Sequence, residues 1–257
     1  MGIIIPARCF RKLPSAGLLH GRVVVVMLPG LLIGLLVGAE GLADWSIQVG
    51  AIQDGTDPAG NGIVHDSAGG AFIAGDFSGN ASFGATRLTA QGSVAAFVMH
   101  VTAMGVIDWV IQVGGAIEAK AHAIADDDRG GVLVTGEFRG MASFGSTTLA
   151  THPDSTNAFV MRVTAMGAID WAVQVEGSLG CMSTGYGVAN DGMGGALVTG
   201  AFSGNATFGG RSLASRNSDA FVMHVTRLGG IAWVTHLGGA FDDLARDIVA
   251  DGWGGGS

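Results

Sequence analysis

The stretch AFVMRVTAMGAIDWAVQV, residues 158–175, decides the fold of this chain because it occurs in three similar copies. The other copies are AFVMHVTAMGVIDWVIQV at 96–113 and AFVMHVTRLGGIAWVTHL at 220–237, each 62 residues from the middle copy. Each copy contains two apolar runs joined by a short segment with Gly, the pattern of two strands joined by a turn. The constant spacing indicates a repeated structural unit.

Markers outside this stretch recur in the same order. Four of the five Trp residues are spaced 64, 62 and 62 residues apart, and an Asp precedes a Gly pair in each unit. A Gly also closes an apolar run, and a Phe-Gly pair follows it. The recurring residues are Trp45, Trp109, Trp171 and Trp233; Asp66, Asp127, Asp191 and Asp251; Gly75, Gly136 and Gly200; and the pairs at 83–84, 144–145 and 208–209.

The middle unit reads as short strands separated by turns, and no window of the body shows a sustained helical period. The expected strands are 121–125, 132–138, 158–164 and 169–175, with a small hairpin over 142–149 and turns at 126–130 and 166–167. We therefore predict an all-β fold. Four antiparallel strands per repeat is the pattern of a β-propeller blade.

A blade buries its faces only against its neighbours, so each repeat needs the same apolar side chains. The four Trp residues fit this role, as do Phe97, Phe159 and Phe221. The recurring glycines at 75, 136 and 200 are expected where strands approach too closely for a Cβ atom.

These repeats resemble the SBBP repeat, the bacterial β-propeller repeat family. In the middle unit the shared residues are Ala125 with the adjacent Asp, Gly130-Gly131, Val134 to Gly140, Phe144-Gly145, Ala158 to Met161 and Gly167 to Trp171. The first unit departs with Ile-Ala-Gly at 73–75, and Asn190 stands where the second unit has Asp126. The resemblance covers nearly all of residues 44–257. It implies an exported or surface-located bacterial protein with a propeller-like fold, and it implies no particular activity.

The repeat region, residues 44–257, contains three complete units over 60–113, 121–175 and 185–237, which we call units 1, 2 and 3. Partial units lie at 44–59 and 238–257. Propellers have four to eight blades, so three and a fraction do not close an ordinary ring. We expect a piece of a longer ring, with the strand at Trp45 completing the last blade; the alternative is a short chain that closes by oligomerising.

Residues 1–43 have the layout of a secretory signal peptide. Basic residues precede an uncharged stretch over 23–38, and Gly41-Leu42-Ala43 supplies small residues for cleavage. This predicts a secreted or cell-envelope location. The alternative is an uncleaved membrane anchor, which would be the only membrane contact.

Composition restricts the function. The chain has 45 Gly, 13% charged residues and a formal net charge of −8, which argues against nucleic-acid binding. The repeat region has one cysteine, Cys181, expected to be buried filler because no His or basic residue near it in sequence would activate it.

Residues present in every unit are expected to serve the fold. The turn Asp126-Asp127-Asp128 lacks the alternating ligands of a calcium loop, so backbone-bonding Asx turns are predicted. The sequons at Asn80 and Asn205 occupy equivalent repeat positions and favour a turn role. His100 and His224 align with Arg162, which predicts an exposed strand position. No metal or cofactor is expected.

Binding is expected in the variable loops instead. Fourth-to-first and second-to-third connections open on the same end of a blade. We expect them to present negative charge together with the single Tyr, and the candidate ligand-binding residues are Asp54, Asp57, Glu118, Tyr186, Asp242 and Asp243.

Local enzyme motifs, such as the Gly-x-Ser-x-Gly elbow, are missing. The sequence favours a non-enzymatic exported scaffold that binds a protein or a polysaccharide through its loops, with no catalytic residues assigned. The alternative is a propeller hydrolase or lyase whose catalytic groups lie partly in further blades.

Overall fold

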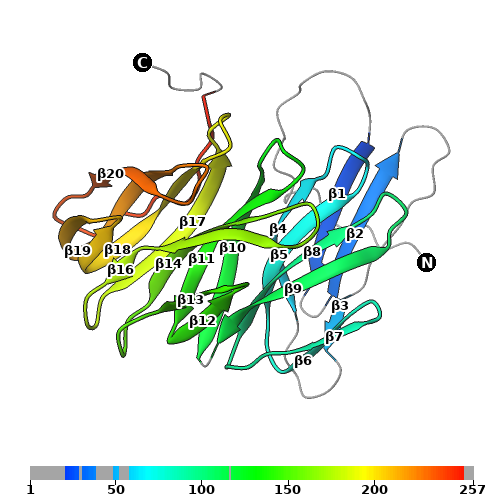
Figure 1. Cartoon of the computed structure of the whole chain (residues 1–257), viewed down its shortest axis with the longest axis horizontal. Helices are drawn as coiled ribbons and strands as arrows, with labels where there is room; N and C mark the ends of the chain where they lie inside the picture. The colour runs from blue at the N-terminus through cyan, green and yellow to red at the C-terminus, as the bar shows by residue number, and fades with distance from the viewer. Residues whose placement is uncertain (1–20, 29–30, 39–48, 52–57, 116, 252–257) are drawn as a thin grey trace.

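The computed structural model describes residues 21–28, 31–38, 49–51, 58–115 and 117–251, and within them it contains strands and no helix. The prediction of an all-β chain is therefore confirmed. The sheets are antiparallel and lie side by side in chain order, from β4 and β5 to β19 and β20 (Figure 1). No helix long and apolar enough to span a membrane occurs in these residues.

Each unit is a meander of four strands, and the strands of the middle unit follow the predicted positions. The second and third strands of units 1 and 2 are nearly continuous apolar runs and are buried along most of their length, as expected for strands that are covered on both faces. The strands are β4 (Ala59–His65), β5 (Ala71–Phe77), β8 (Ala95–Val101) and β9 (Ile107–Gly115) in unit 1; β10 (Glu118–Asp126), β11 (Val132–Arg139), β14 (Asn157–Val163) and β15 (Ile169–Gln174) in unit 2; and β17 (Met182–Asn190), β18 (Ala196–Phe208), β19 (Arg211–Val225) and β20 (Ile231–Leu237) in unit 3.

The small hairpin between the second and third strands of each unit joins the sheet of the preceding unit. In unit 2 the hairpin of β12 (Met141–Phe144) and β13 (Thr147–Ala150) pairs with β9 of unit 1. In unit 3 the far half of β18 pairs with β16 (Glu176–Gly177), which follows the last strand of unit 2. Adjacent units are therefore tied by backbone hydrogen bonds as well as by side-chain packing.

The same exchange occurs before unit 1. The hairpin of β6 (Asn80–Phe83) and β7 (Thr86–Thr89) pairs with β3 (Val49–Ala51). β3 thus takes the place that β9 has in the next unit, as expected for the end of a preceding fourth strand. Trp45 and most of the predicted signal segment lie outside the described residues. Within that segment, β1 (Gly21–Leu28) and β2 (Leu31–Gly38) form an antiparallel hairpin.

Three phenylalanine rings form the same cluster in every unit. In unit 2 the ring of Phe144 lies 5.6 Å from Phe138 and 5.1 Å from Phe159, and all three side chains are fully buried. The predicted core residues Phe97, Phe159 and Phe221 are each 0% exposed. One apolar cluster spans units 1 and 2, and a second spans units 2 and 3. The core is therefore shared between units.

The Trp residues connect neighbouring units through the turns. The indole Nε1 of Trp109 donates to the carbonyl oxygen of Ala165 at 2.9 Å, and that of Trp171 donates to Arg227 at 3.0 Å. Both acceptors belong to the third-to-fourth turn of the following unit. These two indoles are half-buried, whereas Trp233 is 38% exposed and has no turn of a following unit over it within the described residues.

Gly136 illustrates the close approach predicted for the recurring glycine. A Cβ atom there would collide with the backbone of Lys120 and Ala121, at the bulge where the pairing register of β10 shifts. Gly75 and Gly200 face the equivalent bulges of β4 and β17 in the same way. These three positions exclude any side chain because the neighbouring strand occupies its space.

Candidate functional site

The recurring turn aspartates bond to the backbone, as predicted for Asx turns. Asp127 Oδ1 accepts hydrogen bonds from the amides of Arg129 and Gly131, both at 2.8 Å. Asp66 and Asp191 make the same pair of bonds. Within the described part of the chain, no three His, Cys, Asp or Glu side chains are placed to hold a metal ion.

The second carboxylate oxygen of each turn aspartate contacts the Arg or His side chain at the aligned position of the third strand. Asp127 Oδ2 lies 2.6 Å from Nη2 of Arg162, and the equivalent Asp66–His100 and Asp191–His224 distances are 2.9 and 2.7 Å. The prediction that this position is exposed was wrong, since the three side chains are only 12–17% exposed. Arg and His can replace each other at this position because both can donate to the equivalent buried carboxylate.

These contacts affect the acid–base behaviour of two aspartates. Burial alone would raise the pKa of Asp66 and Asp191. The hydrogen bonds from His100 and His224, together with the backbone amides of the turns, outweigh burial and hold both pKa values below the ordinary value. The aspartates are therefore stable anions inside the turns, with a structural role.

The candidate ligand residues from the sequence do not form one site. Asp54 and Asp57 lie outside the described residues. Asp242 accepts a hydrogen bond from the amide of Ser218 at 3.0 Å, and the amide of Asp243 donates to the Ser218 carbonyl at 2.6 Å. The Asp242 carboxylate and the Asp243 backbone therefore fix the segment after β20 against β19.

Glu118 and Tyr186 belong to a different cluster, on the first strands of units 2 and 3. Glu118 forms an ion pair with Lys120. Tyr186 occupies the bulge of β17, with its ring 5.9 Å from that of His122 and the guanidinium of Arg246 5.8 Å from its centre. The ring thus contacts a side chain of unit 2 and one beyond unit 3, so Tyr186 supports the contact between units.

Glu137 joins the two halves of this cluster. Its Oε2 accepts a hydrogen bond from the Thr184 hydroxyl at 2.7 Å, and its Oε1 lies 3.8 Å from His122 Nε2 and 3.9 Å from Lys120 Nζ. Burial would raise the pKa of Glu137, but His122, Thr184 and Lys120 together lower it. The carboxylate thus carries a charge that links unit 2 to unit 3.

The two kinds of variable loop lie against each other, at the end of the sheets that we call the loop face. The amide of Ser93 donates to Ile117 at 2.7 Å, and the amide of Thr156 donates to Cys181 at 3.1 Å. In both cases a second-to-third connection contacts the approach to the next first strand. The loop face is therefore a continuous surface, as the sequence predicts.

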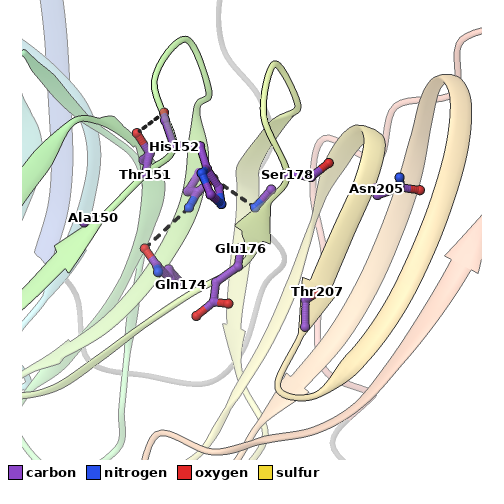
Figure 2. Close-up of a pocket in the computed structure, with 10 residues that line it drawn as sticks. Ala150, Thr151, His152, Gln174, Glu176, Ser178, Asn205 and Thr207 are labelled. Atoms are coloured by element: carbon purple, nitrogen blue, oxygen red, sulfur yellow. Dashed lines mark hydrogen bonds between the residues drawn. The ribbon is translucent and has the colours of Figure 1, made fainter.

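A groove of about 470 Å³ opens at the junction of units 2 and 3. Glu176 pairs with Thr207 across two neighbouring strands, so Gln174 and Asn205, each two residues away, share their face. Figure 2 shows these side chains with His152 around the opening. Within the part of the chain that the structure describes, the Glu176 carboxylate, the His152 imidazole and the side-chain amide of Asn205 have no hydrogen-bond partner and can receive a ligand.

Buried polar residues hold the groove in shape. The side chain of Asn157, 1% exposed, accepts a hydrogen bond from the Gly177 amide at 3.1 Å and donates to Gln174 at 3.5 Å (Figure 2). The sulfur of Cys181 accepts from the amide of Asn205 at 3.2 Å and lies 3.0 Å from the Ser178 hydroxyl. Cys181 is 6% exposed, which confirms that it fills a buried position.

Glu176 departs from the repeat, and Asn205 recurs at Asn80 but is replaced at the preceding junction. At the preceding junction, β9 and β12 pair in the same register, with Gly114 at the place of Glu176 and Met141 at the place of Asn205. The sequence assigned Asn205 a turn role and gave no role to Glu176. The departure of Glu176 from the Gly found at the aligned position 114 is the signal that would have identified it.

No protein-family model matches this chain, and no curated protein matches it significantly.

Proposed function

We propose that this chain is an exported, non-enzymatic scaffold of the β-propeller type that binds a polysaccharide through the groove between units 2 and 3. Successive four-stranded sheets that share hairpins and Trp contacts support a blade-like stacking. The signal-like segment 1–43 supports export, and the resemblance to the SBBP repeat supports a bacterial secreted or envelope location.

The chemistry of the groove favours a hydroxylated ligand over a protein. Side-chain amides both donate and accept hydrogen bonds, and a carboxylate accepts from hydroxyl groups. Gln174, Asn205 and Glu176 supply these groups on one face, and Thr207 adds a hydroxyl. Protein-binding hot spots are rich in Trp, Tyr and Arg, and the lining contains none of these residues.

The number of carboxyl groups in the groove also favours binding over hydrolysis. Most glycoside hydrolases use two carboxyl groups on opposite sides of the scissile bond. Among the residues that line the groove, Glu176 supplies the single carboxylate. The observation that carries the proposal is that unpartnered polar side chains stand here where the preceding junction has Gly114 and Met141.

The test is a binding screen of the full chain against soluble polysaccharides, followed by calorimetry on the best ligand. The double variant Glu176→Gly/Asn205→Met copies the preceding junction, so the sheet should tolerate it. We expect binding to weaken at least about tenfold, a change of about 1.4 kcal/mol. The control Glu118→Gln, outside the groove, should bind normally. Unchanged binding in the double variant would refute the site, and release of new reducing ends would favour the hydrolase alternative.

A further inference from the structure

A line of large apolar side chains stands at the opposite end of the sheets, which we call the turn face. Met104, Met166 and Leu228 occupy the same position in the third-to-fourth turn of units 1, 2 and 3. They are 86%, 84% and 80% exposed. We call these three residues the apolar stripe.

The turns themselves do not need these side chains. In each one the amide of the following Gly donates to a Thr carbonyl, as Gly167 does to Thr164 at 2.9 Å, and the backbone closes without the intervening residue. Short polar residues are usual in such turns because they bond to the backbone. Single exposed apolar residues are normal, but the recurrence of one at the same turn position in all three units makes this face a candidate surface for a partner.

The three stripe residues follow one another along the turn face because the turns of neighbouring units adjoin. Trp109 donates to Ala165, the residue before Met166, and Trp171 donates to Arg227, the residue before Leu228. Stacked sheets lie about 10 Å apart, so the apolar tips repeat at about that distance.

This spacing selects the shape of the partner. Seven residues of an α-helix rise about 10.5 Å and return to nearly the same face. Three residues of a strand also cover about 10 Å, but they reverse the face on which the side chain lies. A helix with an apolar residue at every seventh position can therefore contact all three tips at once.

The charged residues around the stripe indicate which charge the partner should carry. The exposed acids Asp108 and Asp170 lie two residues beyond the turns of units 1 and 2, and Asp128 lies in the adjacent first-to-second turn. Arg162 bridges Asp170 and Asp127 and offsets part of this charge. The remaining turn-face side chains that carry or can carry charge are Asp66, Asp126, Asp191, His65, His100, His224, Arg129 and Arg227. Carboxylates outnumber arginines on this face.

We propose that the turn face binds a basic amphipathic helix of a partner protein, with its apolar residues on Met104, Met166 and Leu228 and its lysines or arginines beside the flanking aspartates. This surface is separate from the groove, because the third-to-fourth turns and the variable loops lie at opposite ends of the strands. Its failure would leave the polysaccharide proposal unaffected.

The test measures binding of two fluorescent peptides to the full chain. One is a lysine- and alanine-rich helical peptide with leucine at every seventh position over three repeats, and the other has the same composition with leucines at irregular spacing. We expect at least about tenfold tighter binding of the regular peptide, with loss of that preference in Met104→Ser/Met166→Ser/Leu228→Ser. Leu179→Ser, which removes a 70% exposed residue from the loop face, is the matched control and should bind normally.

Every other outcome overturns the proposal. Equal binding of the two peptides, or binding of neither, would show that the stripe does not recognise this helix. Stripe-dependent self-association in sedimentation would assign the surface to a second copy of the chain. Stripe-dependent binding to phosphatidylcholine vesicles would assign it to a lipid surface. Circular dichroism of the triple variant should match that of the parent chain, because serine suits these turns.

Discussion

Replacement of Trp171 by alanine tests whether neighbouring units hold one another in place. The indole is half-buried between units 2 and 3, packs with the cluster that they share, and donates to the Arg227 carbonyl. Removal of a fully buried Trp side chain costs about 3–5 kcal/mol, so a half-buried ring should account for about 2 kcal/mol. The lost hydrogen bond contributes about 1 kcal/mol more. We therefore expect Trp171→Ala to lower the free energy of unfolding by about 3 kcal/mol.

Trp233 supplies the matched control within the same molecule. It has the same place in unit 3, but it is 38% exposed, and its indole nitrogen has no partner among the described residues. Trp233→Ala should therefore cost about 1 kcal/mol. Trp171→Phe, which retains a ring but no N–H donor, should fall between the two alanine variants.

The assay is urea unfolding followed by circular dichroism, because removal of an indole changes the fluorescence signal itself. With a slope of about 2–3 kcal/mol per molar, the midpoints of Trp171→Ala and Trp233→Ala should differ by about 1 M. Trp109→Ala should resemble Trp171→Ala, since its indole makes the equivalent bond. Equal costs for Trp171→Ala and Trp233→Ala would refute the assignment of stability to contacts between units.

Three further predictions concern the turns and bulges. Gly136→Ala should lower the free energy of urea unfolding by more than about 3 kcal/mol, because the new Cβ atom collides with the backbone of the neighbouring strand. Gly192→Ala, where the space around the Cβ position is open, should lower it by about 1 kcal/mol. Equal decreases for the two variants would contradict the bulge geometry. Asp127→Ala should lower the free energy of unfolding by about 3 kcal/mol in the same assay, because it removes two hydrogen bonds of the turn and leaves Arg162 without a buried partner. A decrease below about 1 kcal/mol would contradict this prediction. The pKa of Asp191 is lower in the folded chain than in the unfolded chain, so its contribution to stability should be complete above the unfolded pKa of 3.8 and lost as pH falls through the folded value. In an acid-unfolding titration, the variant Asp191→Asn should not show this loss of stability. A titration profile identical to that of the parent chain would contradict the prediction.

The sequence predicts the strands and turns of this fold because the repeat shows which residues recur at each position. The three copies of the 158–175 pattern fix two strands and the turn between them, and Gly136 and Phe159 have the structural roles expected of repeated positions. Local pattern does not indicate which sheet a short hairpin joins. The pairing of β12 with β9 of the preceding unit was therefore not predicted, because hydrogen-bonding partners depend on how the units stack.

The candidate site was predictable in location and not in detail. Variable loops indicated the loop face, where the groove lies, yet the acids selected there include Asp242, which binds the backbone of strand β19. Glu176 was missed because its relation to Gly114 depends on the strand register. The partial burial of His100 was missed because Asp66, its partner, lies 34 residues away in sequence.

The exchange of hairpins between units has a consequence for the order of folding during synthesis. β9 ends at Gly115, but its hydrogen-bonding neighbour β12 begins only at Met141. At about 5–20 residues per second, a ribosome adds the intervening residues in a few seconds. During that interval the emerging unit has an unpaired strand edge, and the next unit to leave the exit tunnel covers it. The chain should therefore fold from its amino terminus, each repeat being completed by its successor.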